Sequence, residues 1–480
     1  MNHRTRQLVR RIISHVWGPT GSILLHLLVV FLLFKLVVGE PPRKIEEFTI
    51  TYLPVVPPPP DAFDPPDNKP WDDLPPTPVD MPVQPDVPSS EPPPDFKADD
   101  WMARGPQELA GPPILDDVRS SAILPVGYIQ RTTAGRMNGI ASYAGGGYSE
   151  PSVVKALEWL KKNQAPDGSW GPNKPAMTGL GLLTFLAHGE TLSSDAYGET
   201  VGRAVRFLMT QQNEAGQFHS TDGQAAPYVH AIATYAVSEA YGMMRVPQLR
   251  PVMEKAVGVI VTGQQPGGGW DYRYAKAGRR DTSVAGWQIQ ALKAARIAGA
   301  ETPGLAEALE RASADLLAVR DPETGRFYYT DRTSHKTDSI TAIASLCLQL
   351  LGRGRSGAVD SAFRAMGQAA CDWEKPGEWP MYAWYYLTQT HFHEGGMAWS
   401  RWNGQFSKTL VRHQNEDGSW TSPAGVRGGA GSEAHLGPVY STTLAALSLQ
   451  VYYRVLPTYK QVAAEPVTQA AKNDIGVEIL

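Results

Sequence analysis

The feature that most constrains this chain is a turn that recurs six times between residues 150 and 455. Each copy follows a helix-forming stretch, contains a glycine, ends on an aromatic residue and leads into a second helix-forming stretch. The six copies are Gln164–Trp170, Gln211–Phe218, Gln264–Trp270, Arg320–Phe327, Asp372–Trp379 and Gln414–Trp420. A repeat at an interval of about 40–60 residues is typical of folds assembled from copies of one structural unit. The repeat therefore has to be interpreted before any single residue.

The stretches on the two sides of each turn differ in polarity. Those before the turns carry one apolar stripe, which predicts a helix with one buried face, whereas those after the turns are apolar on all sides and predict buried helices. We expect outer helices over 151–164, 199–213, 249–263, 304–319, 356–371 and 403–413. We expect inner helices over 176–188, 228–242, 282–298, 338–351, 380–392 and 438–454.

Six helix pairs are enough to close a ring, and the last apolar stretch lacks the polar outer face that the end of an open solenoid requires. We therefore predict an all-α fold over residues 151–458, an α6/α6 toroid. Its inner helices run parallel, so that their positively polarised N-termini meet at one rim of a central cavity. We expect the turn glycines to adopt positive backbone dihedrals and the turn aromatics to pack as wedges between neighbouring pairs.

The N-terminal part of the chain predicts a membrane anchor. Residues 1–20 are basic, and residues 21–39 form an apolar stretch just long enough to cross a bilayer as a helix. Arginines before the stretch favour a cytoplasmic N-terminus, which places the rest of the chain outside the cytoplasm of a bacterial inner membrane. A cleaved signal peptide is the alternative, although Val37-Val-Gly39 is a poor cleavage site.

Residues 40–113 are rich in proline and aspartate, which predicts a disordered, extended linker with a reach on the order of 200 Å. Residues 114–150 receive no assignment, and residues 459–480 form a C-terminal tail. The net charge of -4 gives no support to nucleic-acid binding. Cys347 and Cys371 are too few for a disulfide scaffold, and we expect two buried free thiols.

The Gln-x-x-x-Gly-x-Trp turns resemble the QW repeats of the squalene cyclase and protein prenyltransferase superfamily, an α/α toroid. The resemblance covers residues 150–455 of 480. It implies the fold and does not imply an activity, because this architecture carries several functions.

Cyclases of that superfamily protonate an alkene with the acid of an Asp-x-Asp-Asp-Thr motif. Here the nearest match is Gly278–Thr282, which retains Asp281 and Thr282 but has Arg280 in place of the acid. We expect the guanidinium to keep Asp281 ionised, the wrong form for a proton donor. We interpret Asp281 as the N-cap of an inner helix and give Asp338 the same role.

Protein prenyltransferases hold zinc through an Asp-x-Cys pair and a later histidine. In this chain Ser345 stands where the aspartate before Cys347 should be. His391 and His393 are two positions apart, which on a helix directs them to different sides. We therefore expect no zinc and no other cofactor.

The predicted rim still carries polar and aromatic candidates for a ligand site, with Asp281 and Asp338 as the catalytic candidates. The candidates are Tyr228, His230, Arg280, Asp281, Lys336, Asp338, Tyr382, Tyr385 and Tyr440. Aromatics around a concave surface with a few charges are typical of ligand sites. A positive rim would suit an anionic head group or a peptide carboxylate. His230 alone is more typical of a structural histidine than of a binding residue.

The predicted anchor contains Ser22 and His26, four residues apart and hence on one helix face. A short span with Ser-x-x-x-His before a proline-rich linker resembles the N-terminal half of TonB-type energy transducers. The resemblance implies that this face contacts a proton-driven motor complex. The alternative is a plain anchor with both side chains near the interface.

Together these patterns predict a single-pass membrane protein whose toroid binds a ligand or a protein partner outside the cytoplasm. One alternative is an enzyme acting on isoprenoid or other lipid substrates through Asp281 or Asp338. Another is a glycan-active toroid.

Overall fold

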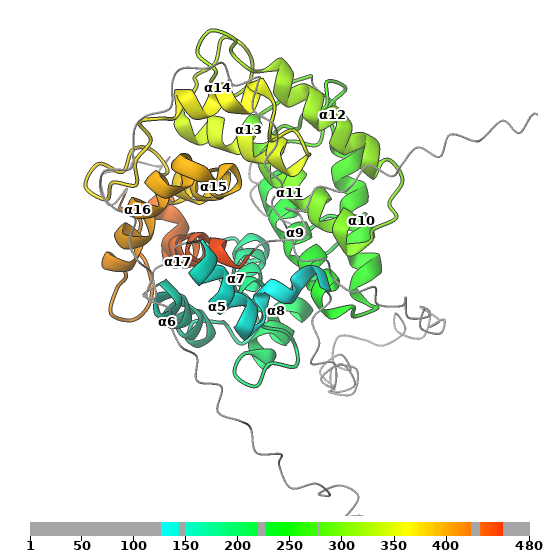
Figure 1. Ribbon diagram of the computed structural model, residues 1–480. Coiled ribbons are helices and arrows are strands. Elements are labelled where there is room, and N and C mark those ends of the chain that lie inside the picture. The colour runs from blue at the N-terminus through cyan, green and yellow to red at the C-terminus, as the bar shows by residue number, and fades with distance from the viewer. Residues whose placement is uncertain (1–125, 144–148, 219–225, 277, 424–432, 455–480) are drawn as a thin grey trace, which may run out of the picture. The chain divides into compact units, whose positions relative to one another are not determined.

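A computed structural model describes residues 126–143, 149–218, 226–276, 278–423 and 433–454 (Figure 1). The chain divides into two compact units, Met1–Phe96 and Lys97–Leu480, and every described residue belongs to the second. The predicted anchor with Ser22 and His26, the linker and the C-terminal tail lie outside the described residues. Within the described part, no helix combines the length and the apolar character needed to cross a membrane.

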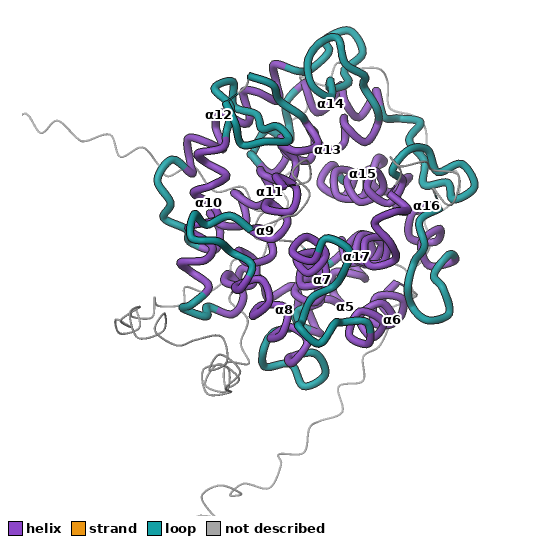
Figure 2. Tube along the Cα trace, turned by 180° about the vertical axis from the view of Figure 1, so that it is seen from behind, coloured by secondary structure: helices purple, strands orange, loops and turns teal. Residues whose placement is uncertain are grey.

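The described residues of the second unit form six helix pairs arranged in a ring and contain no β-strand (Figures 1 and 2). The outer helices are α6 (Ser149–Lys162), α8 (Gly198–Thr210), α10 (Leu249–Gly263), α12 (Leu305–Ala318), α14 (Gly357–Ala365) and α16 (Gly396–Arg412). The inner helices are α7 (Lys174–His188), α9 (Ala226–Met244), α11 (Thr282–Ala298), α13 (Asp338–Leu350), α15 (Pro380–Glu394) and α17 (Gly437–Leu449).

The polarity of the sequence explains the two layers. Every residue of α7 after Lys174 is buried, as expected of a helix that is apolar on all sides. The outer helix α6 buries one stripe, which includes Val153, Leu157 and Leu160, and exposes its lysines. The prediction of an all-helical fold with buried inner and amphipathic outer helices is confirmed.

The glutamine of the repeated turn joins neighbouring pairs. In four turns its side-chain Nε2 donates to the carbonyl of the turn glycine and to a carbonyl of the next outer helix, at 2.7–3.0 Å. The four glutamines are Gln164, Gln212, Gln264 and Gln414. In the last turn the acceptor is Ser152 of α6, at 2.8 Å, so the sixth pair is bonded to the first and the ring is closed. The glutamine of the second turn is Gln212 rather than the predicted Gln211.

The turn glycines have positive φ in all six copies. At Gly325, where φ is 74°, a Cβ atom would also lie 2.6 Å from the carbonyl oxygen of Ser361 in the next outer helix. Glycine is therefore required here both by the backbone conformation and by the close approach of a neighbouring chain segment.

The tryptophans of three turns are bonded inside their own helix pair, whereas the prediction was a wedge between pairs. Trp170 Nε1 donates to Leu160 O of α6 at 2.9 Å, and its ring covers Gly181 of α7. Trp270 and Trp420 make the equivalent bond to the carbonyl ten residues earlier. The connection between pairs is instead supplied by the glutamine.

The largest errors in the predicted helix boundaries are at the start of α16 and at the end of α14. α16 begins at Gly396 rather than near 403, because Gly395 and Gly396 both have positive φ and end α15 abruptly. α14 ends at Ala365 rather than near 371. The turn that follows it departs from the repeat, since Trp379 is only partly buried and Gly377 has no neighbour within 4 Å of a Cβ position.

The segment for which no structure was predicted supplies a cap, which comprises η3 (Val126–Arg131) and α5 (Thr133–Ser142). Arg131 is buried against the last turns of α7 and α9, where it pairs with Glu239 at 2.7 Å and donates to Leu186 O at 3.2 Å. Removing one partner of a buried ion pair is costly, so this pair fixes η3 to the ring. The expected free thiols, Cys347 and Cys371, are unpaired with each other and buried.

Candidate ligand site

Four tyrosines gather around the start of α11, and we call them the tyrosine cluster: Tyr228, Tyr272, Tyr329 and Tyr382. Tyr228 and Tyr382 come from the first turns of α9 and α15, and Tyr272 and Tyr329 each follow a turn aromatic by two residues. All four are only partly buried. Residues that are far apart in the sequence therefore meet at the N-terminal ends of the inner helices, as the parallel arrangement predicts.

Hydroxyl groups connect the cluster across three inner helices. Ser283 Oγ of α11 lies 2.8 Å from the Tyr228 hydroxyl and 3.0 Å from the Tyr382 hydroxyl. The Tyr272 and Tyr329 hydroxyls are hydrogen-bonded to each other. Burial raises the pKa of Tyr382, so the phenol is neutral and available as a hydrogen-bond donor. The site thus offers aromatic faces and neutral hydroxyls side by side.

Asp281 is the N-cap of α11, as predicted, and its Oδ1 accepts the backbone N–H groups of Ser283 at 2.9 Å and Val284 at 3.0 Å. The carboxyl is fully buried. It also interacts with the Tyr329 and Tyr272 hydroxyls. The same carboxyl therefore orders the helix start and lies against the cluster.

Arg280 lowers the pKa of Asp281, as predicted, but the effect of burial is larger. Burial raises the pKa of the Asp281 carboxyl above its usual value, and the hydrogen bonds to it and the charge of Arg280 only partly offset the rise. The Arg280 guanidinium is directed elsewhere, because it pairs with Asp315 at 2.8 Å and donates to Tyr329 O at 3.1 Å. Arg280 therefore offsets the effect of burial on the pKa of Asp281 only in part.

The other charged candidates are engaged in ion pairs. Lys336 pairs with Asp321, and Asp338 pairs with Arg326, each at 2.5 Å. Asp338 is the first residue of α13 rather than its N-cap, which is Thr337, so the predicted capping role was wrong. The charged groups predicted for the rim are thus already neutralised by neighbouring side chains.

A second buried carboxyl, that of Glu433, was not predicted. It accepts the N–H of Met381 at 2.9 Å and that of Tyr382 at 3.3 Å. It also accepts the Ser422 hydroxyl at 2.5 Å. Burial raises the pKa of Glu433, and these hydrogen bonds partly offset the rise. Glu433 therefore occupies the N-terminus of α15 in the way that an anionic ligand would.

His230 has a structural role. Its Nδ1 accepts the N–H of Phe218 at 3.1 Å, and its Nε2 donates to Ala256 O at 2.9 Å. In three other pairs a threonine hydroxyl accepts the N–H of the turn aromatic, and these threonines are Thr178, Thr341 and Thr442. Burial lowers the pKa of His230 to about 4, so the imidazole is neutral. His230 does not belong to the tyrosine cluster.

The remaining candidates lie deeper in the ring. Tyr385 stacks on Trp287 of α11 with ring centroids 5.7 Å apart, and its hydroxyl accepts from the buried Arg454 at 3.2 Å. Tyr440 is buried, and the Glu433 carboxylate contributes to raising its pKa. His391 packs against Trp402, with ring centroids 5.1 Å apart, and is bonded to Leu387 O.

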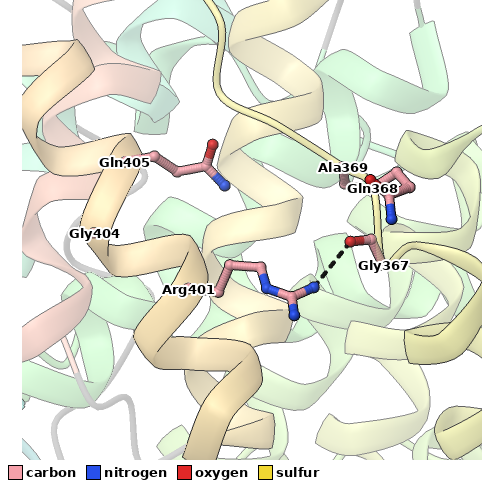
Figure 3. Close-up of a pocket in the computed structure, with 6 residues that line it drawn as sticks. All are labelled: Gly367, Gln368, Ala369, Arg401, Gly404 and Gln405. Atoms are coloured by element: carbon pink, nitrogen blue, oxygen red, sulfur yellow. Dashed lines mark hydrogen bonds between the residues drawn. The ribbon is translucent and has the colours of Figure 1, made fainter.

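A separate pocket of about 550 Å³ opens on the outer layer, where the chain after α14 meets α16 (Figure 3). It is lined by Gly367, Gln368, Ala369, Arg401, Gly404 and Gln405. Arg401 already donates to Gly367 O at 3.0 Å (Figure 3). No residue predicted from the sequence as a site residue lines this pocket.

No protein-family model matches the chain, and no curated protein matches it either. Among solved structures, the GH76A α-1,6-mannanase of Salegentibacter sp. HEL1_6 aligns with 64% of this chain and 98% of its own, at 12% identity and a TM-score of 0.45. A variant of the type II terpene cyclase MstE from Scytonema aligns with the same shares, at 14% identity and a TM-score of 0.44. A D-mannose isomerase aligns with 63% of this chain and 97% of its own, at 12% identity and a TM-score of 0.49. Such weak similarity favours no particular activity.

Proposed function

We propose that the toroid binds an uncharged, hydroxyl-bearing ligand through the tyrosine cluster. The observation that carries the proposal is the hydroxyl chain from Tyr228 through Ser283 to Tyr382, which joins three inner helices beside partly exposed aromatic rings. Ring faces pack against apolar patches of a ligand, and the hydroxyls accept or donate hydrogen bonds to its polar groups.

The charges around the cluster favour a neutral ligand over the anionic one first expected. Arg280 and Lys336 are paired with aspartates, and the N-termini of α11 and α15 are occupied by Asp281 and Glu433. An anion placed there would find few unsatisfied donors and two neighbouring carboxyls. Neutral glycans and the hydroxyl end of a lipid share the required chemistry.

Native mass spectrometry of the full chain tests the proposal by identifying a co-purified ligand. Tyr382→Phe and Ser283→Ala each remove a link of the hydroxyl chain and should weaken binding of that ligand roughly fivefold to tenfold, the value of one hydrogen bond of about 1 kcal/mol. Tyr241→Phe is the matched control, because Tyr241 is also partly buried but contacts Arg245 outside the cluster. Equal affinity of all three variants would exclude the cluster as the binding site.

A second function, acid catalysis on an isoprenoid or other lipid substrate, is favoured by the elevated pKa of Asp281. A protonated carboxyl in an aromatic surround can donate a proton. Asp281→Asn separates the two functions, because asparagine is about as good an N-cap as aspartate but cannot act as the acid. The variant should keep its affinity for the ligand whether or not the toroid is an enzyme. If the toroid is an acid catalyst, the variant should also lose the lipid conversion that the wild type shows.

We propose the cellular setting from the sequence alone: residues 21–39 anchor the chain in a bacterial inner membrane, and the toroid lies outside the cytoplasm. Reporter fusions after residue 113 test this orientation, and activity of a cytoplasm-specific reporter would reject it. For the proposed contact of Ser22 and His26 with a motor complex, His26→Ala should abolish cross-linking to a motor subunit. Unchanged cross-linking would remove that partner.

A further inference from the structure

One of the six turn aromatics does not pack as the others do. Five of them are at most 1% exposed, and these are Trp170, Phe218, Trp270, Phe327 and Trp420. The sixth, Trp379, is partly exposed at the start of α15. The buried tryptophans donate their indole N–H to a carbonyl of the outer helix, whereas no described residue accepts a hydrogen bond from the indole N–H of Trp379. Trp379 therefore does not join the two helices of its own pair.

Another tryptophan of the same turn attaches it to the ring. Trp373 packs against the buried Trp384 of α15, with ring centroids 5.6 Å apart. On its other contact it stacks on His413, the C-cap of α16, at 4.4 Å and within 6° of parallel. Such aromatic contacts stabilise the segment that carries the ring. The turn is thus held by Trp373, and the Trp379 side chain is left for another role.

The backbone at Trp379 is unfavourable for a tryptophan. This residue is the N-cap of α15, and its φ of 48° lies in the left-handed region. The N-cap of α7 has the same conformation, with a φ of 54°, but there the residue is Asn173. Asparagine tolerates positive φ, whereas a bulky side chain in this region is an outlier. Because residues held in such conformations cluster at ligand sites, the strain points to a role for the indole itself.

Trp379 lies at the same helix start as one member of the tyrosine cluster. It precedes Tyr382 by three residues, and the Glu433 carboxyl accepts the N–H groups of Met381 at 2.9 Å and Tyr382 at 3.3 Å. His435, two residues after Glu433, meets the Trp379 ring edge to face, with centroids 6.1 Å apart. One segment therefore fixes both the start of α15 and the orientation of the indole.

The surroundings of the indole are polar. Glu374, Lys375 and Glu378 of the same turn are exposed and carry charges of both signs. A hydrocarbon chain is bound in an enclosed apolar site, which this rim does not resemble. A sugar ring is better suited, because its C–H groups pack on the electron-rich face of an aromatic ring while its hydroxyls remain available for hydrogen bonds.

We propose that Trp379 stacks on a sugar ring of a neutral glycan whose hydroxyls are bound by the tyrosine cluster. The inference rests on the proposed function and narrows its ligand from hydroxyl-bearing compounds in general to glycans. Trp379 supplies the aromatic face, and the Tyr382 and Ser283 hydroxyls bond polar groups of the same ligand. The strained backbone at the start of α15 holds the indole at the rim, where a glycan chain can reach it.

Calorimetric titration of the full chain with linear neutral oligosaccharides of glucose, mannose, galactose and N-acetylglucosamine tests the inference. Trp379→Asn removes the indole and copies the N-cap of α7. It should bind the best of these oligosaccharides roughly tenfold more weakly and unfold in urea at the wild-type concentration or above it, because asparagine relieves the strain. Trp379→Phe keeps an aromatic face and should retain most of the affinity. Trp373→Ala is the matched structural control and should unfold at a lower urea concentration.

The outcomes separate this inference from the proposed function. Unchanged affinity of Trp379→Asn, or a loss of stability in that variant, overturns the stacking role. If Tyr382→Phe weakens binding of the same oligosaccharide and Trp379→Asn does not, the hydroxyl site stands and the stacking role fails. If the wild type binds none of the oligosaccharides but binds the long-chain alcohol farnesol, the ligand is not a glycan and the proposed function stands. If neither variant changes the affinity, both fail.

Discussion

Two turn glycines allow the role of the close contact between pairs to be measured separately from backbone strain. Gly325 and Gly377 occupy equivalent turns and share a φ of 74°. A Cβ at Gly325 would lie 2.6 Å from Ser361 O and 3.0 Å from the Ser361 Cβ, whereas a Cβ at Gly377 would meet nothing within 4 Å. Replacement by alanine therefore imposes the same backbone change at both sites and a clash at only one.

The expected magnitudes follow from these environments. Alanine at positive φ costs about 1–2 kcal/mol, and the lower entropy of the unfolded chain offsets about 0.4–1 kcal/mol of it. Gly377→Ala should thus lower the free energy of unfolding by roughly 0–1.6 kcal/mol. At Gly325 the added carbon is roughly 0.7 Å closer to an oxygen than the usual limit of about 3.3 Å, so α14 must shift. Such overpacking adds about 1–3 kcal/mol.

Urea unfolding of the full chain, followed by far-ultraviolet circular dichroism, measures both variants. The slope of the transition has to match that of the wild type, so that the shift in midpoint reports stability. Gly325→Ala should be the less stable variant by about 1–3 kcal/mol. Equal losses would refute the argument that the turn glycines exist to admit the next outer helix, and would leave only the backbone conformation as their cause.

Further predictions concern single contacts. Because the pKa of His230 is about 4, the free energy of unfolding should fall by on the order of 3 kcal/mol as the pH drops from about 6.5 to about 4. His230→Thr copies the threonine of other pairs and should remove this part of the pH dependence, measured by urea unfolding at several pH values. If the free energy of unfolding of the variant falls with pH as steeply as that of the wild type, the prediction is contradicted. Asp315→Ala leaves the Arg280 guanidinium without its buried partner and should cost about 3–5 kcal/mol in the same urea assay, whereas a loss below 1 kcal/mol would show that the pair contributes little. Trp270→Phe removes the indole bond to Ile260 O and should cost about 1–3 kcal/mol, and no loss would show that the ring alone holds the turn.

The sequence was sufficient to predict the helix pairs, because polarity and repeat reinforce each other in every copy. α7 and α17 are apolar on all sides, and their neighbours α6 and α16 are amphipathic, so burial follows directly from composition. The start of α16 was predicted too late, because the sequence pattern did not indicate that Gly395 alone connects α15 to α16. The positive φ of Gly395 and Gly396 allows this short connection.

Two of the four residues of the tyrosine cluster were predicted from the positions of the inner helices. Tyr228 and Tyr382 were identified from their positions at inner-helix starts, but Tyr272 and Tyr329 were missed. Both follow a turn aromatic by two residues, as Ser422 does in the last turn, so comparison of equivalent positions would have found them. Glu433 gave no such signal, because it reaches the start of α15 from a segment 52 residues later in the chain.

The position of Glu433 also changes what the ring can recognise. Parallel inner helices direct partial positive charge toward one rim, which suggested an anionic ligand. In this chain the Asp281 and Glu433 carboxyls already accept the free N–H groups of α11 and α15, and Thr337 caps α13. The helix dipoles at these positions therefore stabilise the protein's own acids rather than a bound anion. With these helix N-termini occupied by carboxyls of the protein itself, we expect selectivity to come from the arrangement of hydroxyls around Ser283.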